Sequence, residues 1–173
     1  MKFEEEVGDR EVQFIEKRLN TGRKTLVAYM DWKYQYNCKE RKATGWMSFA
    51  CVAGLQQKNS PDRCRAHLTV RQTREGEGVV YRAEKLTGGP HNHGEMRERV
   101  MVDYAKHRLK LLITQGKEWR QKSLRQIYVD FVDSFPADMD EENKSLFSVV
   151  FPSFQAMELP MRRWKKSIQE MKL

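Results

Sequence analysis

Two cysteines and two histidines constrain the fold of this chain more than any other feature of its sequence. Cys51, Cys64, His91 and His93 follow one another in the spacing C-x12-C-x26-H-x-H. A closed structural zinc site takes four thiolate or imidazole ligands in a tetrahedron, and two of each is a common combination. The four residues therefore form a complete ligand set for one structural zinc ion. The alternative interpretation is two buried thiols and two surface histidines that hold no metal.

The His-x-His pair requires extended backbone. Residues i and i+2 of an extended segment point to the same side, whereas on a helix they lie about 200° apart around the axis. Gly88, Gly89 and Pro90, which precede the pair, also disfavour a helix. We therefore expect the ligands to come from sheet and loop, unlike those of fingers that carry both histidines on a helix.

Alternating residues predict two strands that carry the cysteines. Residues 63–71 alternate between an apolar face, which includes Cys64, and a cationic face with Arg63, Arg65, His67, Thr69 and Arg71. Residues 46–52 form a second apolar run that carries Cys51. Both cysteines are thus expected to point into a core, while one strand presents positive charge.

The remaining N-terminal residues predict a small antiparallel sheet of about five strands. Further strands are expected at 12–19, 25–30, 33–39 and from residue 79, with turns at 20–22, 54–62 and 76–78. Residues 1–11 are acidic and are expected to be irregular. Cys38 alternates with tyrosines and is expected to be buried in a strand rather than to be a fifth ligand. Such a sheet buries little apolar area, so a metal would stabilise it.

These residues resemble the FLYWCH-type zinc fingers. The matching segments are Phe49-Ala50-Cys51, Cys64-Arg65-Ala66-His67-Leu68 and His91-Asn92-His93, with looser matches at Phe14, Leu26 and Tyr34 or Tyr36. The resemblance covers roughly residues 10–94, and the chain departs from the family at Ser48 and Phe49, where the family has Tyr and Trp, and at His67, where it usually has Arg. It implies a zinc-bound sheet similar to that of plant WRKY domains, in a nuclear DNA-binding regulator or chromatin protein.

After His93 the apolar period changes to that of helices. Four segments each predict an amphipathic helix: residues 96–115, the segment from Ser123, residues 141–150 and the segment from about Pro160. Ser123 and Gln126 form a capping box at the start of the second. We therefore predict an α+β chain, with a zinc module at 10–94 and a helical bundle at 95–173. The helices are candidates for contact with protein partners or for self-association.

Positive charge is concentrated on the predicted zinc module. Residues 21–94 hold 13 Lys or Arg and 6 Asp or Glu, a net charge of +7, whereas residues 95–173 carry +3 and residues 1–20 carry −2. Clustered positive charge is typical of a phosphate-binding surface. The expected DNA contacts are the strand residues Arg63, Arg65, His67 and Arg71 and the loop residues Lys39, Arg41 and Lys42. Arg65 is the central candidate for base recognition, because arginine can bond guanine through two hydrogen bonds.

The sequence thus predicts sequence-specific binding of double-stranded DNA by a transcription regulator. The alternative is a zinc-stabilised module that docks an acidic protein partner on chromatin. RNA binding is a third interpretation, but the cationic strand offers few aromatic side chains for base stacking. We find no Ser/His/Asp, Cys/His or paired-carboxylate pattern, so we expect no enzymatic activity and no small-molecule substrate.

The same composition predicts no membrane segment. The longest apolar runs, near residues 111–114 and 145–154, are much shorter than a helix that spans a membrane. The N-terminus, with Glu4, Glu5 and Glu6, does not match a signal peptide. We expect a reducing compartment, in which three cysteines serve as thiols or metal ligands.

Overall fold

The computed structural model describes residues 2–18, 21, 23–135 and 139–170. The chain divides into two compact units, Met1–Val100 and Met101–Leu173. The first contains a sheet and a short helix, and the second contains helices, so the predicted α+β class is confirmed. No helix among the described residues is long and apolar enough to span a membrane.

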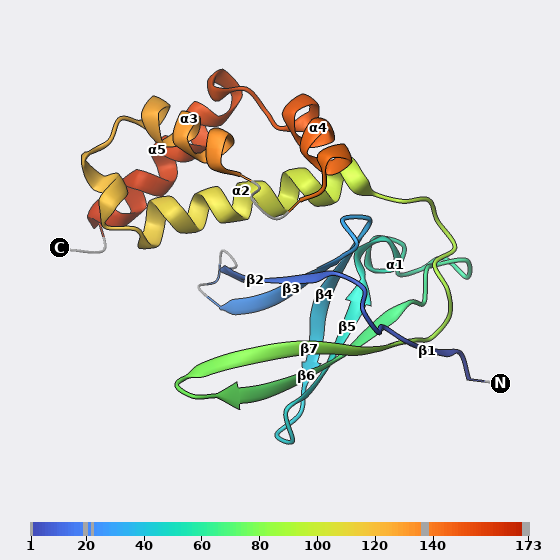
Figure 1. Ribbon diagram of the computed structural model, residues 1–173. Helices are drawn as coiled ribbons and strands as arrows, with labels where there is room; N and C mark the ends of the chain where they lie inside the picture. Colours follow the sequence, from blue (N-terminus) through green and yellow to red (C-terminus); the bar gives the residue numbers. More distant parts are fainter. Residues whose placement is uncertain (1, 19–20, 22, 136–138, 171–173) are drawn as a thin grey trace. The chain divides into compact units, whose positions relative to one another are not determined.

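The first unit is built on a curled, seven-stranded antiparallel sheet (Figure 1). Its strands are β1 (Glu4–Glu6), β2 (Val12–Arg18), β3 (Lys24–Met30), β4 (Tyr34–Arg41), β5 (Trp46–Cys51), β6 (His67–Glu75) and β7 (Gly78–Thr87). Strands β2 to β7 form a meander in which each strand pairs with the next, and β1 pairs with β7. Residue 19 and the predicted turn at Asn20 and Gly22 lie outside the described residues.

One face of the sheet carries the core of this unit. Alternate positions of the strands supply apolar side chains to it, as the period of two predicts. The buried cluster consists of Val7, Leu26, Ala28, Met30, Tyr36, Met47, Phe49, Cys51, Cys64, Ala66, Leu68, Val70 and Leu86. Both predicted ligand cysteines therefore face this core.

The sheet is larger than the predicted five strands, partly because the acidic N-terminus is ordered. Strand β1 pairs with β7 from Glu4↔Thr87 to Glu6↔Lys85, and the Lys85 Nζ lies 2.6 Å from a Glu4 carboxylate oxygen. Val7 follows β1 and is buried in the core. Long-range pairing and one apolar anchor thus order a segment that its composition alone predicted to be irregular.

The strand predicted at 63–71 begins later than expected. Cys64 and Ala66 are buried and Arg63 and Arg65 are exposed, so the predicted alternation holds, but strand pairing starts only at His67. The cause is the neighbouring strand. Strand β5 ends at Cys51, and the chain turns into helix α1 (Val52–Gln56), which overlaps the end of the predicted apolar run at 46–52 and the start of the predicted turn at 54–62. Residues 63–66 therefore have little strand beside them to pair with.

The second unit consists of helices that follow or extend the predicted ones. They are α2 (Arg97–Gln115), the 3-10 turn η1 (Glu118–Gln121), α3 (Leu124–Ser134), α4 (Glu141–Val150) and α5 (Phe154–Glu170). Ser123 caps α3 by accepting a hydrogen bond from the Gln126 backbone N–H, as predicted, and Asp140 caps α4 through the Asn143 N–H.

Helix α5 begins at Phe154, before the predicted start at Pro160. The Ser153 carbonyl accepts the first helical bond from Met157 N, and the Ser153 hydroxyl oxygen lies 3.4 Å from Ala156 N. Pro160 therefore stands inside the helix, where the usual effect of proline predicted a boundary.

The core of the helical unit is a cluster of aromatic rings. Neighbouring centroids lie between 4.9 Å (Phe131 and Phe135) and 6.0 Å (Tyr128 and Phe151) apart. Phe147 lies 4.9 Å from Phe151 and closes the cluster. Aromatic pairs at these separations contribute beyond the area that they bury.

Candidate metal centre

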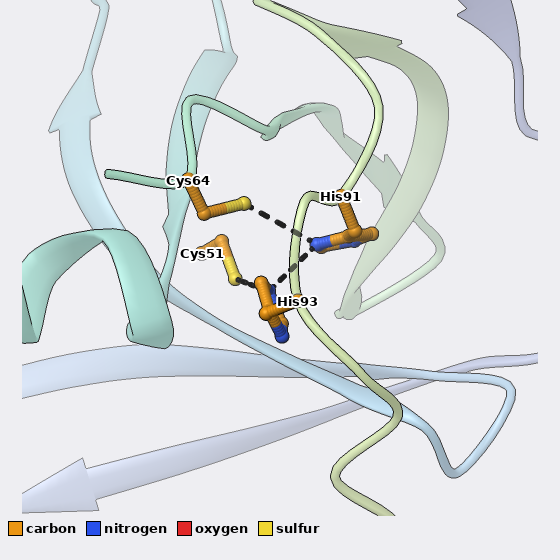
Figure 2. Close-up of side chains that lie close together, drawn as sticks. All are labelled: Cys51, Cys64, His91 and His93. Atoms are coloured by element: carbon orange, nitrogen blue, oxygen red, sulfur yellow. Dashed lines mark hydrogen bonds between the residues drawn. The ribbon is translucent and has the colours of Figure 1, made fainter. Parts of the chain in front are cut away.

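The four predicted ligands converge at one end of the sheet (Figure 2). Cys51 ends β5 and precedes α1, Cys64 lies in the segment before β6, and both histidines lie in the loop that follows β7. One ligand atom from each residue lies within 4.8 Å of all the others. The structure therefore brings together residues up to 42 positions apart into a cluster that can hold a metal ion.

The distances within the cluster fit a tetrahedral ion. Cys51 Sγ lies 3.3 Å from His93 Nε2, Cys64 Sγ lies 3.5 Å from His91 Nδ1, and the two nitrogens are 3.1 Å apart. Tetrahedral zinc with ordinary bond lengths would set sulfur and nitrogen about 3.5 Å apart and the two nitrogens about 3.3 Å apart. These three distances are thus already close to those that such an ion requires.

The outer nitrogen of each histidine has a hydrogen-bond partner. His93 Nδ1 lies 2.9 Å from the carbonyl oxygen of Gly94, which can only accept, so Nδ1 carries the proton and Nε2 is left with its lone pair. His91 Nε2 lies 2.6 Å from the hydroxyl of Tyr36, which leaves Nδ1 for the cluster. Partners of this kind fix the tautomer and the ring orientation of metal-binding histidines.

Tyr34 supports the His91 imidazole from its face. The two rings are stacked, with centroids 3.7 Å apart and planes 4° apart, and Tyr34 meets His93 edge-on at 5.7 Å. Tyr34 and Tyr36 are two residues apart in β4 and so lie on one face of the strand. Both were expected on a strand, without this role. The signal was their alternation, which put two aromatic rings on the face that carries the ligands.

Burial keeps two of the four side chains, Cys51 and His91, uncharged in the metal-free site. It raises the pKa of the Cys51 thiol, and the nearby Cys64 thiol adds to this increase. Burial also lowers the pKa of His91 to about 4, and the neighbouring His93 contributes to that decrease. At neutral pH the Cys51 thiol is therefore protonated and the His91 imidazole is uncharged, so a metal would displace a thiol proton and find a free nitrogen.

Close backbone approach holds the ligand loops together. Gly88 has a positive φ, and a Cβ atom on it would lie 2.1 Å from the Arg65 carbonyl oxygen, so only glycine fits there. Asn92, between the two histidines, donates its side-chain N–H to the Asp62 carbonyl at 2.7 Å. The histidine loop is thus tied to the segment that carries Cys64.

The predicted DNA contacts fall into two groups. Lys39, Arg63, Arg65 and His67 line one cavity, beside the two cysteines. Arg41 ends β4 and Lys42 follows it, near the pair that Arg71 forms in register with Trp46. The Arg71 guanidinium lies 5.7 Å from the indole centroid, a cation–π distance. All seven residues are exposed except His67, which is half-buried.

One residue in each group was not predicted from the sequence. Trp46 is exposed beside Arg71 in the second group, and Lys58 lines the cavity of the first. Trp46 could have been found from its place at the start of the apolar run, where a strand emerges from a turn. No local signal marked Lys58.

Cys38 lies apart from the metal cluster. It is half-buried in β4, at a bulge, and packs against the core of the sheet. It is not one of the four clustered ligands.

Comparison with known proteins gives no match to a family model, to a curated protein or to a solved structure.

Proposed function

We propose that Cys51, Cys64, His91 and His93 bind one structural zinc ion. The convergence of two sulfur and two nitrogen atoms within 4.8 Å carries this proposal. Mixed thiolate and imidazole ligands favour zinc over the hard cations Ca²⁺ and Mg²⁺, which prefer oxygen. Four protein ligands close the coordination shell, so the ion would hold the fold rather than activate water.

We further propose that the zinc-bound sheet binds double-stranded DNA as a nuclear transcription regulator, in the manner of the FLYWCH-type fingers that its sequence resembles. The uncompensated charge of the seven predicted contacts supports this. Arg10, Lys24, Lys33 and Lys85 of the same unit each form an ion pair with a carboxylate. Within the described residues no such pair involves the seven predicted DNA contacts.

Lys and Arg side chains that form no ion pair within the protein are free to contact phosphates. Each such contact favours binding, because it releases a counterion from the nucleic acid. Strand β6 also continues the cationic face of Arg63 and Arg65 through His67 to Arg71. Alternate side chains along a strand lie about 6.5–7 Å apart, a spacing that can follow neighbouring phosphates or base edges. In this proposal Arg65 contacts a base edge, and Lys39, Arg41 and Lys42 contact phosphates.

A binding selection from random duplexes, followed by two substitutions, tests this function. Arg65→Ala should weaken binding to a selected duplex by about 1–3 kcal/mol more than binding to a scrambled one, because a lost base contact costs discrimination. Arg41→Ala should weaken both duplexes alike and reduce the salt slope by about 1. Arg74→Ala, which removes an exposed arginine outside both groups, is the control.

The result that would overturn the proposal is a zinc-loaded protein that selects no duplex and binds DNA without salt dependence. Retention of an acidic chromatin protein by the same preparation would then support the alternative function, a protein-interaction module.

A further inference from the structure

A cationic cavity lies next to the metal centre and has no role in holding the metal. It has a volume of about 490 Å³, within the range of about 300–1,000 Å³ that is common for small-ligand sites. Basic side chains of three separate segments line it: Lys39 from β4, Lys58 from the loop after α1, and Arg63, Arg65 and His67 from the approach to β6.

The cavity is distinct from the space between the four ligand atoms. Cys51 and Cys64 form part of its wall, but His91 and His93 are not among its lining residues. A metal held between the cysteines and the histidines therefore need not occupy it.

The positive charge of the cavity is not neutralised by the protein. None of the described residues that line it is acidic, and none of its five basic side chains forms an ion pair within the described part of the chain. Internal contacts fix the wall instead. Arg63 donates to the Lys58 carbonyl at 3.3 Å, and His67 Nδ1 lies 2.6 Å from the Arg65 carbonyl, which leaves Nε2 as the ring atom available to a ligand.

Several converging cations in a concave site favour a phosphate monoester over a backbone phosphodiester. A monoester carries a charge of about −1.5 to −2 at pH 7 and three accepting oxygens. A diester carries a single charge and is connected on both sides, so it fits a convex surface better than a cavity. The planar guanidinium group of arginine can donate paired hydrogen bonds to two oxygens of such a monoester. The Ala50, Gly54 and Leu55 part of the wall leaves room for an uncharged substituent.

We propose that this cavity binds the terminal phosphate of a nucleotide, either free or at the end of a DNA strand. The nucleic-acid source is favoured because the wall continues into β6, so a strand that leaves the cavity would follow the cationic face toward Arg71. The strand-end form of the ligand rests on the proposed DNA-binding function, whereas binding of a free nucleotide does not.

The test uses the whole zinc-loaded chain and three pairs of probes: a selected duplex with 5′-phosphate or 5′-hydroxyl ends, adenosine monophosphate or adenosine, and a serine peptide with or without phosphate. We expect the phosphorylated duplex and the monophosphate each to bind about tenfold more tightly than the unphosphorylated partner, as one added charge-assisted contact would give. Lys58→Gln, which removes a cation that the DNA proposal does not use, should abolish this advantage.

Two further variants separate an effect of the cavity from a general effect of net charge. Leu55→Glu places a carboxylate at the cavity wall and should also abolish the advantage, whereas Arg74→Gln removes an equal charge elsewhere and should preserve it. Zinc content and hydrogen-exchange protection of the sheet are measured for each variant, so that a loss through unfolding is recognised.

Each outcome decides the proposal. If both duplexes bind equally and Lys58→Gln weakens them equally, the cavity holds internal phosphates and the proposal is wrong, while the DNA-binding function stands. If no duplex binds but the monophosphate binds in a Lys58-dependent manner, the cavity assignment stands and the DNA function fails. Stronger binding of the phosphopeptide, or the absence of any phosphate advantage, overturns the proposal.

Discussion

The two units of this chain stabilise their cores by different means. The sheet unit packs its largest buried cluster against one face of the sheet and brings two cysteines and two histidines together at one end. The helical unit has no such cluster among its described residues, and its core is a set of aromatic rings between capped helices. Under the proposed function, one chain thus joins a sheet that zinc stabilises to helices that pack around aromatic rings.

The largest expected difference between the two units is their response to removal of the metal. Cys64→Ser or His93→Ala should unfold the sheet unit, because structural zinc supplies about 10 kcal/mol or more of apparent folding free energy. Hydrogen exchange resolved along the chain should show loss of protection in β2 to β7 and retained protection in α3 to α5. Cys38→Ser, outside the cluster, is the control. Protein that contains no stoichiometric zinc by elemental analysis, or that keeps its sheet after chelation, would contradict the expectation.

A substitution in the aromatic core should destabilise the helical unit and leave the sheet unit unchanged. Phe131 is buried and contacts the rings of Phe135 and Phe151. Phe131→Ala should therefore cost about 3–5 kcal/mol of that unit's stability. Zinc content and protection of the sheet should be unchanged. Denaturant unfolding followed by zinc release and by helix content would separate the two transitions. A loss of zinc that accompanies the helical transition would show that the units do not unfold independently.

A smaller effect is expected from Tyr36→Phe. This change removes the hydroxyl 2.6 Å from His91 Nε2 while keeping the buried ring. Loss of such a partner lowers metal affinity by about 10–100-fold. Tyr34→Phe, on the same face of β4, keeps its ring stacked on His91 and is the matched control. Competition with a zinc chelator measures both affinities, and equal values for the two variants would remove Tyr36 from this role.

The two units should also differ in their response to pH. Zinc binding at neutral pH should displace the proton of Cys51, whose pKa burial raises, but none from His91, whose pKa is about 4. Zinc affinity should therefore fall by about tenfold per pH unit for each displaced thiol proton as the pH decreases.

The helical unit should be insensitive over the same range. Hydrogen bonding to Lys122 and Gln126, together with the charge of Lys122, lowers the pKa of the Asp130 carboxyl from 3.8. Its contribution is therefore present above that value and is lost only in stronger acid. Chelator competition and helix content, each followed from pH 7 to 5, check both statements. A helix content that falls together with zinc affinity would contradict them.

Local chemistry made part of this structure predictable. The alternation at 63–71 correctly assigned the buried and exposed side chains, and the ligand set followed from residue type and spacing alone. The Ser123 cap was predictable for the same reason, because its partner lies three residues away.

Contacts between distant residues were not predictable. Strand β1 depends on pairing with β7, and the bond between Tyr36 and His91 joins residues 55 positions apart. Helix α1 has five residues, too few for a helical period to show, and its presence moves Cys64 out of the strand. Lys58 joins the cationic cavity only because the loop after α1 folds back, which no local pattern indicates.

The position of β1 beside β7 sets an order of assembly during synthesis. The meander from β2 to β7 can form one hairpin at a time, but β1, which is made before the other strands, must wait for the last of them. At ordinary rates of translation this wait lasts several seconds. Glu4, Glu5 and Glu6 suit this interval, because charged side chains keep an unpaired strand from joining another chain. These charges thus keep β1 itself from wrong pairing until β7 is complete.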